Sequence, residues 1–146
     1  MATISEDYVS FECAKLLKEK GFDGWCVKYY NSCGGYLLTC SMILNCGITV
    51  NNSKLWDILK PHDSYAAPTL QMACKWLRIE HNIHIEPHIV RTKCSYGYMP
   101  NYIDLKELKQ HFPFDEFDFS NADEYVCITY DKACEVALKY CLENLI

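Results

Sequence analysis

The feature that most constrains the fold is a helix that passes directly into a strand within residues 64–90. Apolar residues recur at helical spacing from Leu70 to Leu77, which is typical of an amphipathic helix with one buried stripe. Thr69 precedes this stripe as an N-cap, and Asn82 follows it as a left-handed helix stop. From Ile83 onward apolar residues alternate, which is the period of a strand. The segment therefore predicts a helix over residues 70–81 and a strand over residues 83–92.

Two further segments carry the same kind of helix signal. In residues 10–22, Ser10 suits the N-cap and Gly21 suits the position just after the helix. In residues 129–145, Thr129 is the expected N-cap. The residues of this last helix that we expect to face the core are Ala133, Ala137, Leu138, Cys141 and Leu145.

The remaining strand signals form two hairpins. Residues 25–30 and 36–40 flank a glycine-containing turn, and residues 83–92 are joined to residues 95–103 by a short connection. Pro87 has no N–H to donate, so its strand is expected at an edge or with a bulge. The other assignments are less direct, namely a strand at 47–50 or a helix at 55–59, a helical turn or two at 104–111, and a loop at 112–121.

The resulting order is α-β-β-α-β-β-α. Hairpin-connected strands make antiparallel sheets, and helices on one face of such a sheet give an α+β fold. We therefore predict a single α+β domain over residues 1–146, with an antiparallel sheet of about four strands in two hairpins and three helices.

Composition and charge limit the class of partner. The formal net charge is −5, which repels the phosphate backbone, so binding to nucleic acid is not expected. Lys15, Lys18 and Lys20 lie on one predicted helix and form either a local basic patch or a solvated helix face. The sequence contains no apolar run of about 18 residues, which a membrane span requires. Its acidic first ten residues do not resemble a signal peptide, so we expect a cytoplasmic protein.

The chain contains ten cysteines. No Cys-x2-4-Cys pair of the kind typical of zinc sites is present. Several cysteines fall on the apolar stripes of predicted helices, where a reduced thiol packs as a small hydrophobe. Reduced core thiols are the preferred interpretation, and a metal site or a thiol-based sensor are the alternatives. The stripe cysteines are Cys13, Cys74, Cys134 and Cys141.

Three segments carry a resemblance to a known family. These are residues 14–23 (AKLLKEKGFD) with the tyrosines that follow, residues 65–83 around YAAPTLQ and WLR, and residues 129–138 beginning TYDKA. Together they resemble a family of small uncharacterised proteins encoded by phages and prophages of gut bacteria. The resemblance implies a phage origin and the cytosol of a bacterial host, and it implies no activity or cofactor. Met72 departs from the family pattern, which often has Glu three residues after the capping Thr.

One predicted strand carries a possible metal-ligand set. His84, Glu86 and His88 alternate along it and would project from one face. Two imidazoles and a carboxylate are suitable ligands for zinc or ferrous iron. The alternative is that these residues are simply on the surface, because the opposite face of the strand, with Ile83, Ile85 and Ile89, is the one expected to face the core.

Two aromatic groups are candidate partner-binding residues. The tyrosines of the adjoining strand are expected on one face, where with His84 and His88 they form either a binding platform or cross-strand pairs that stabilise the sheet. The phenylalanine-rich segment 112–119 either packs on its own domain or meets a partner. The candidate residues are Tyr96, Tyr98, Tyr102, Phe112, Phe114, Phe117 and Phe119.

No Gly-x-Ser-x-Gly motif, phosphate-binding loop or paired-carboxylate pattern is present, so the sequence gives no reason to expect an enzyme and implies no cofactor. The function we predict is that of a phage-derived accessory protein that binds a host or phage protein. The alternative is a metal-dependent or small-ligand-binding protein that uses His84, Glu86 and His88.

Overall fold

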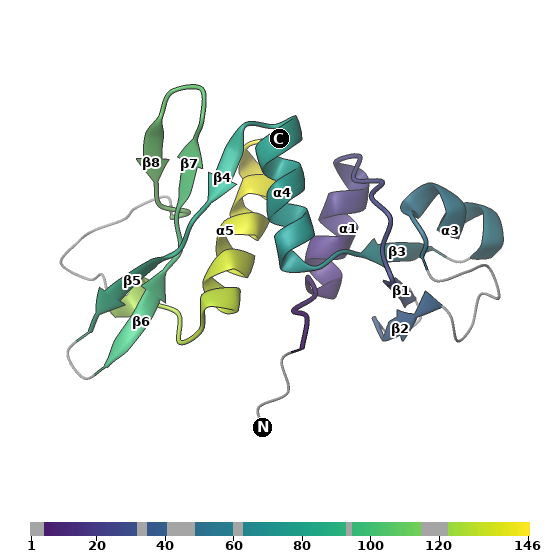
Figure 1. Cartoon of the computed structure of the whole chain (residues 1–146), viewed down its shortest axis with the longest axis horizontal. Coiled ribbons are helices and arrows are strands. Elements are labelled where there is room, and N and C mark those ends of the chain that lie inside the picture. Colours follow the sequence, from purple (N-terminus) through teal and green to yellow (C-terminus); the bar gives the residue numbers. More distant parts are fainter. Residues whose placement is uncertain (1–4, 32–34, 41–48, 60–62, 93–94, 115–122) are drawn as a thin grey trace. The chain divides into compact units, whose positions relative to one another are not determined.

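The computed structural model describes residues 5–31, 35–40, 49–59, 63–92, 95–114 and 123–146. Contacts divide the chain into two compact units, Met1–Ala73 and Cys74–Ile146. The boundary falls inside helix α4 (Leu70–Glu80), and a single domain over residues 1–146 stays a prediction. Helices and strands are mixed along the chain, as Figure 1 shows.

The three predicted helices are present with the predicted caps. They are α1 (Phe11–Glu19), α4 and α5 (Tyr130–Asn144). The Thr69 hydroxyl accepts a hydrogen bond from the Met72 backbone N–H at 3.2 Å, and Ser10 and Thr129 cap their helices in the same way. Asn82 has φ of 59° and ends α4 in the left-handed conformation, as predicted. None of the helices in the described ranges combines the length and the hydropathy needed to cross a bilayer.

The first unit contains a three-stranded antiparallel sheet in the order β2-β1-β3. The predicted hairpin of β1 (Lys28–Asn31) and β2 (Leu37–Thr39) is confirmed. The sequence did not indicate β3 (Ser64–Ala67), which pairs with the other edge of β1. Of the two alternatives predicted for the segment between β2 and β3, a strand at 47–50 or a helix at 55–59, the helix is correct, because α3 (Asn52–Leu59) forms there. Residues 41–48, which include the start of the strand alternative, lie outside the described residues.

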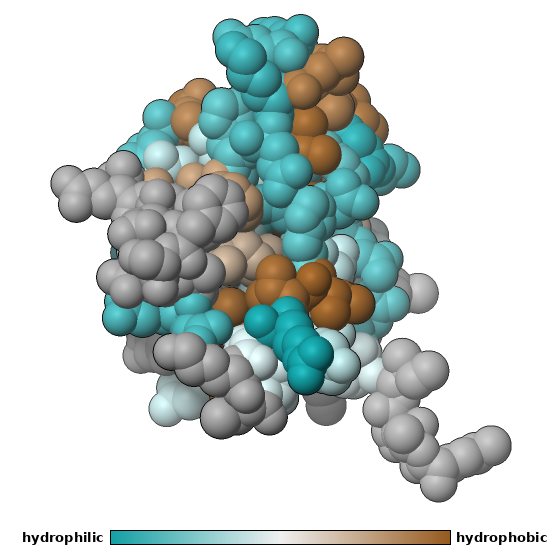
Figure 2. All heavy atoms as spheres, turned by 90° about the vertical axis from the view of Figure 1, so that its left-hand side faces the viewer, coloured by the Kyte–Doolittle hydropathy of each residue, from teal (hydrophilic) through white to brown (hydrophobic). Residues whose placement is uncertain are grey.

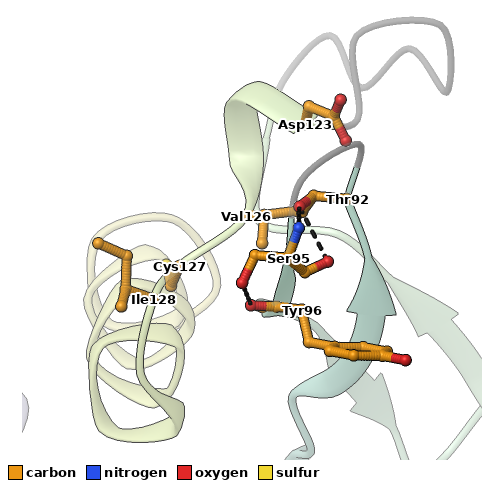
Figure 3. A pocket seen from close by; sticks show the side chains of 8 residues that line it. Thr92, Ser95, Tyr96, Asp123, Val126, Cys127 and Ile128 are labelled. Atoms are coloured by element: carbon orange, nitrogen blue, oxygen red, sulfur yellow. Dashed lines mark hydrogen bonds between the residues drawn. The ribbon is translucent and has the colours of Figure 1, made fainter.

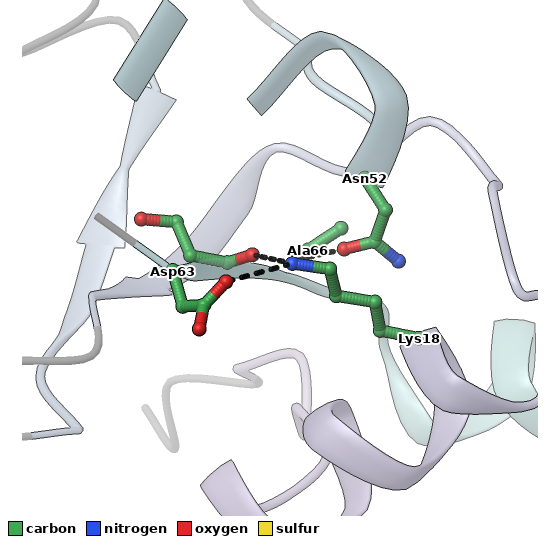
Figure 4. A network of polar contacts seen from close by, with 5 residues as sticks. Lys18, Asn52, Asp63 and Ala66 are labelled. Atoms are coloured by element: carbon green, nitrogen blue, oxygen red, sulfur yellow. Dashed lines mark hydrogen bonds and ion pairs between the residues drawn. The ribbon is translucent and has the colours of Figure 1, made fainter. Parts of the chain in front are cut away.

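A buried asparagine ties α3 to the rest of this unit. The Asn52 side-chain amide donates to the Phe22 carbonyl at 2.7 Å, and its oxygen accepts from the Ala66 N–H at 2.9 Å. Figure 4 shows Asn52 and Ala66 beside Lys18, whose ammonium donates to the Ser64 carbonyl at 3.1 Å. Because Asn52 is only 7% exposed, its two partners have no easy access to water in its absence. Asn52 is therefore a structural residue that positions the start of α3 against β3.

We expect Asn52→Ala to lower the free energy of unfolding by about 2 kcal/mol, since it leaves a buried N–H and a buried C=O unpaired. Urea denaturation followed by circular dichroism measures this change. Ser53→Ala is the control, because it removes an exposed hydrogen bond to Asp23 from the same helix turn and should cost less than about 1 kcal/mol. Equal losses in the two variants would contradict this role of Asn52.

The second unit contains one long hairpin divided in two. β4 (Ile83–Ile85) pairs with β7 (Tyr102–Asp104), and β5 (His88–Arg91) pairs with β6 (Tyr96–Met99). The register is continuous across the gap, because Ile85 faces Tyr102 and His88 faces Met99. Pro87 and Pro100 therefore stand opposite each other. The Glu86 N–H donates to the Asn101 carbonyl at 3.3 Å, so in the alternation of an antiparallel ladder the two prolines occupy a pair that needs no N–H donor toward the partner strand.

The predicted second hairpin is thus confirmed, but the prediction of one sheet of about four strands is wrong in detail. The described residues form three small antiparallel sheets and four helices. Residues 104–111 were predicted to be helical and instead form a turn followed by β8 (Lys109–His111), which pairs with β7. The Asp104 carboxylate accepts from the Lys106 N–H at 2.8 Å and so stabilises the turn in place of a helix.

Helix α5 contacts β4 and β6 in this unit. Its predicted core residues are buried except Leu145, which is 41% exposed because it lies just past the last turn of the helix. The described cysteines are all free, and most are buried, as the reduced-thiol interpretation predicts. The buried ones are Cys13, Cys26, Cys40, Cys134 and Cys141.

Candidate functional site

The candidate site lies at the edge of the β5–β6 hairpin, where the segment that precedes α5 pairs with β6 like an additional strand. The Tyr98 N–H donates to the Cys127 carbonyl at 2.8 Å, and the Cys127 N–H donates back to the Tyr98 carbonyl at 2.9 Å. This reciprocal pair brings the segment that precedes α5 against β6. Gly97 makes the approach possible, because a Cβ there would lie 2.1 Å from Cγ1 of Val126 and 2.9 Å from the Cys127 carbonyl oxygen.

We expect Gly97→Ala to destabilise the protein by about 1–3 kcal/mol, because the added methyl group cannot fit without moving the backbone of residues 126–127. Thermal and urea unfolding measure the loss. Trimming the opposing side chain in Gly97→Ala/Val126→Ala should recover part of it relative to the sum of the two single changes. Strict additivity in this double-mutant cycle would argue against the close contact.

Beyond the Tyr98–Cys127 pair, the segment and the strand diverge and leave a groove. It has a volume of about 610 Å³, within the range of pockets that bind ligands. Figure 3 shows Cys127 and Ile128 on one side of it, and Ser95 and Tyr96 on the other. The Ile128 side chain is 90% exposed and that of Tyr96 is 72% exposed. The lining residues are Thr92, Ser95, Tyr96, Gly97, Asp123, Val126, Cys127 and Ile128.

The groove also contains the outer backbone edge of β6. In an antiparallel strand, residues two apart direct their N–H and C=O groups to the same edge. Tyr98 uses its groups on this edge for Cys127, so those of Tyr96 point into the groove. The Tyr96 carbonyl already accepts from the Ser95 hydroxyl at 3.3 Å, drawn as a dashed line in Figure 3. The edge therefore offers a backbone donor next to two exposed apolar side chains.

One face of the hairpin extends this surface. Ile89 stands opposite Tyr98, and Arg91 stands opposite Tyr96, so all four side chains project from the same face. Ile89 is 72% exposed, like Tyr96. Figure 2 shows the side of the molecule that carries β5 to β8, where hydrophobic residues form patches among hydrophilic ones. Ile89 and Tyr96 are thus two large exposed side chains on one face of the hairpin beside the groove, an arrangement suited to a partner contact.

The three tyrosines that the sequence placed on one face have different environments. Tyr96 is exposed at the groove, whereas the Tyr98 ring packs edge-on against Tyr130 at a centroid distance of 5.8 Å. Because Ile89 rather than His88 stands opposite Tyr98, His88 projects from the other face and does not join these tyrosines. The structure therefore brings Tyr96 to the candidate site and uses Tyr98 to hold the hairpin on α5.

Tyr102 is a core residue. It is 8% exposed, and its ring is stacked with His111 at 5.2 Å and with Tyr140 at 5.9 Å. Burial, together with the nearby Tyr140, raises the pKa of the Tyr102 hydroxyl to about 12, so it stays neutral at physiological pH. Tyr102 thus stabilises the packing of β7 on α5 and is not available to a partner.

The proposed metal ligands make separate contacts. His84 Nδ1 lies 3.4 Å from Arg78, His88 Nδ1 lies 3.3 Å from the Gln110 amide, and Glu86 is exposed. Burial alternates through the gap between β4 and β5, because Ile85 and Pro87 are buried whereas Glu86 and His88 are exposed, as the predicted alternation requires. Within the described ranges, no three His, Cys, Asp or Glu side chains gather in a way that could hold a metal ion.

The phenylalanine-rich segment is described only in part. The ring of Phe114 packs against Tyr125 at a centroid distance of 4.3 Å, and Phe112 is half-buried. These contacts agree with the interpretation that the segment packs on its own chain. Phe117 and Phe119 lie outside the described residues, and their role in partner binding stays a prediction.

Sequence reasoning missed half of the groove. The approach of residues 126–128 to β6 joins segments that are far apart in the chain. The sequence pattern of neither segment predicts that the two pair with each other. Gly97 was the available signal, because a glycine inside a strand often marks the close approach of another backbone.

Comparison of the chain with protein-family models, with curated proteins and with solved structures finds no match.

Proposed function

We propose that this chain is a phage-derived accessory protein that binds an extended segment of a host or phage protein in the groove between β6 and residues 126–128. The observation that carries this proposal is the combination of a strand edge with two highly exposed apolar side chains, those of Tyr96 and Ile128. The resemblance of residues 14–23, 65–83 and 129–138 to small phage proteins supports the phage origin.

The mode of binding follows from the groove's chemistry. An extended peptide can pair its backbone with an exposed sheet edge and place alternate side chains in neighbouring pockets. Here the Tyr96 N–H is the first donor beyond the Tyr98–Cys127 pair, so the peptide would take the place that the chain's own segment leaves after Cys127. Burial of Tyr96 and Ile128 would contribute much of the binding free energy, since a few large side chains usually dominate an interface.

A protein segment suits this site better than a small ligand. The groove has little enclosed polar structure, and its largest side chains extend into solvent. A metal-dependent function has no comparable support, because His84 and His88 make separate contacts with Arg78 and Gln110.

The experiment is affinity capture from phage-infected bacterial cells with the tagged full chain, followed by measurement of the affinity of each captured protein. We expect Ile128→Asp and Tyr96→Ala to weaken binding about tenfold or more, because each removes an apolar side chain from the centre of the contact. The matched control is Leu108→Asp, which also removes a highly exposed apolar side chain in the second unit, 79% exposed, from a turn outside the groove.

A second measurement tests the mode of binding. Hydrogen exchange of the Tyr96 backbone amide should be fast in the free chain and strongly slowed in the complex, because the peptide would accept a hydrogen bond from it. Equal binding by the Ile128 and Leu108 variants, or an unprotected Tyr96 amide in the complex, would overturn the proposed site.

A further inference from the structure

One charged side chain lines the groove between β6 and residues 126–128. Of the eight residues that line it, Asp123 alone carries a formal charge. The Asp123 side chain is exposed, and none of the ion pairs or hydrogen bonds within the described part of the chain involves its carboxylate. Glu124, the next residue, is exposed as well. The groove therefore presents a negative charge with which a cation of the partner can pair.

Asp123 and Tyr96 lie on opposite faces of the β6 edge. Neighbouring residues of a strand project to opposite faces, so Gly97 belongs to one face and the Tyr96 ring to the other. Val126 lies on the Gly97 face, because a Cβ on Gly97 would meet Cγ1 of Val126. Figure 3 shows the Asp123 carboxylate on the side of Val126, and the Tyr96 ring pointing away from it. In a strand added to this edge, the side chains that meet Asp123 and Tyr96 therefore come from adjacent residues.

The nearest cation on the hairpin lies on the other face. Arg91 stands opposite Tyr96 in the β5–β6 register, so its side chain projects from the Tyr96 face. A basic residue of the partner would be repelled on that face and attracted on the face of Asp123. The distribution of charge thus assigns an apolar residue to the Tyr96 face and a basic residue to the Asp123 face.

We propose that the bound segment is basic and carries a lysine or arginine directly beside an aliphatic or aromatic residue. The cation pairs with Asp123, and the apolar side chain packs on Tyr96 and Ile128. This inference rests on the proposed function and names the chemical class of its partner. The net charge of −5 adds a general attraction for such a segment. The pair with Asp123 contributes to specificity and association rate more than to affinity, because an exposed ion pair is weak.

The probe for this inference is a displayed library of random linear peptides. Selections run in parallel on the full chain and on Ile128→Asp, and the groove-dependent peptides are those that bind only the unchanged chain. We expect these peptides to carry Lys or Arg next to an aliphatic or aromatic residue. Circular dichroism and the unfolding temperature check that Ile128→Asp is folded, and Tyr96→Ala is a second variant for the same subtraction.

A charge reversal tests the role of Asp123 directly. Asp123→Lys should select peptides with Asp or Glu in place of the basic residue. The matched control is Glu80→Lys, which makes the same change at an exposed position of α4 outside the groove and should select the same peptides as the unchanged chain. For one selected basic peptide, Asp123→Asn should weaken binding about threefold at low ionic strength and by less in about 1 M salt, because exposed ion pairs are screened.

The outcomes separate this inference from the proposed function. Groove-dependent peptides without a basic residue, or identical peptides from Asp123→Lys and the unchanged chain, would overturn the basic segment and leave the binding of an extended segment in place. If no selected peptide depends on Ile128 or Tyr96, the proposed function fails, and this inference fails with it.

Discussion

The second unit depends on one close backbone approach, that of residues 126–127 to β6 across Gly97. The reciprocal hydrogen bonds between Tyr98 and Cys127 convert a two-stranded hairpin into a broader surface and fix the direction in which the chain enters α5. They also decide where the groove begins, because the two backbones separate immediately afterwards. Since an isolated two-stranded hairpin is only marginally stable in water, this contact and the packing of Tyr98 on Tyr130 are what hold β5 and β6 in place.

Local signals predicted the helices well. Ser10, Thr69 and Thr129 each accept the hydrogen bond expected of a cap, and Asn82 adopts the left-handed stop, because these features depend only on neighbouring residues. The hairpins were also predictable, since each joins strands that are adjacent in sequence.

Non-local features were not predictable in the same way. Strand β3 has no apolar alternation of its own and exists because it completes the edge of β1. Tyr102 appeared suitable for a partner-binding face, yet Tyr140 of the last helix stacks on it and buries it. At the groove, the sequence indicated Tyr96 but not Ile128, whose position follows from the pairing of Cys127. In each case the deciding contact comes from a distant part of the chain.

The facing prolines Pro87 and Pro100 affect the outer edges of the hairpin. Beside them, β5 and β6 have four residues each, whereas the segments that stack into amyloid fibrils are about six or seven residues long and lack proline. A long, uninterrupted hairpin rich in isoleucine and tyrosine would offer a template for intermolecular cross-β assembly. The two missing backbone donors therefore make this ribbon resistant to fibril growth while leaving a short edge open.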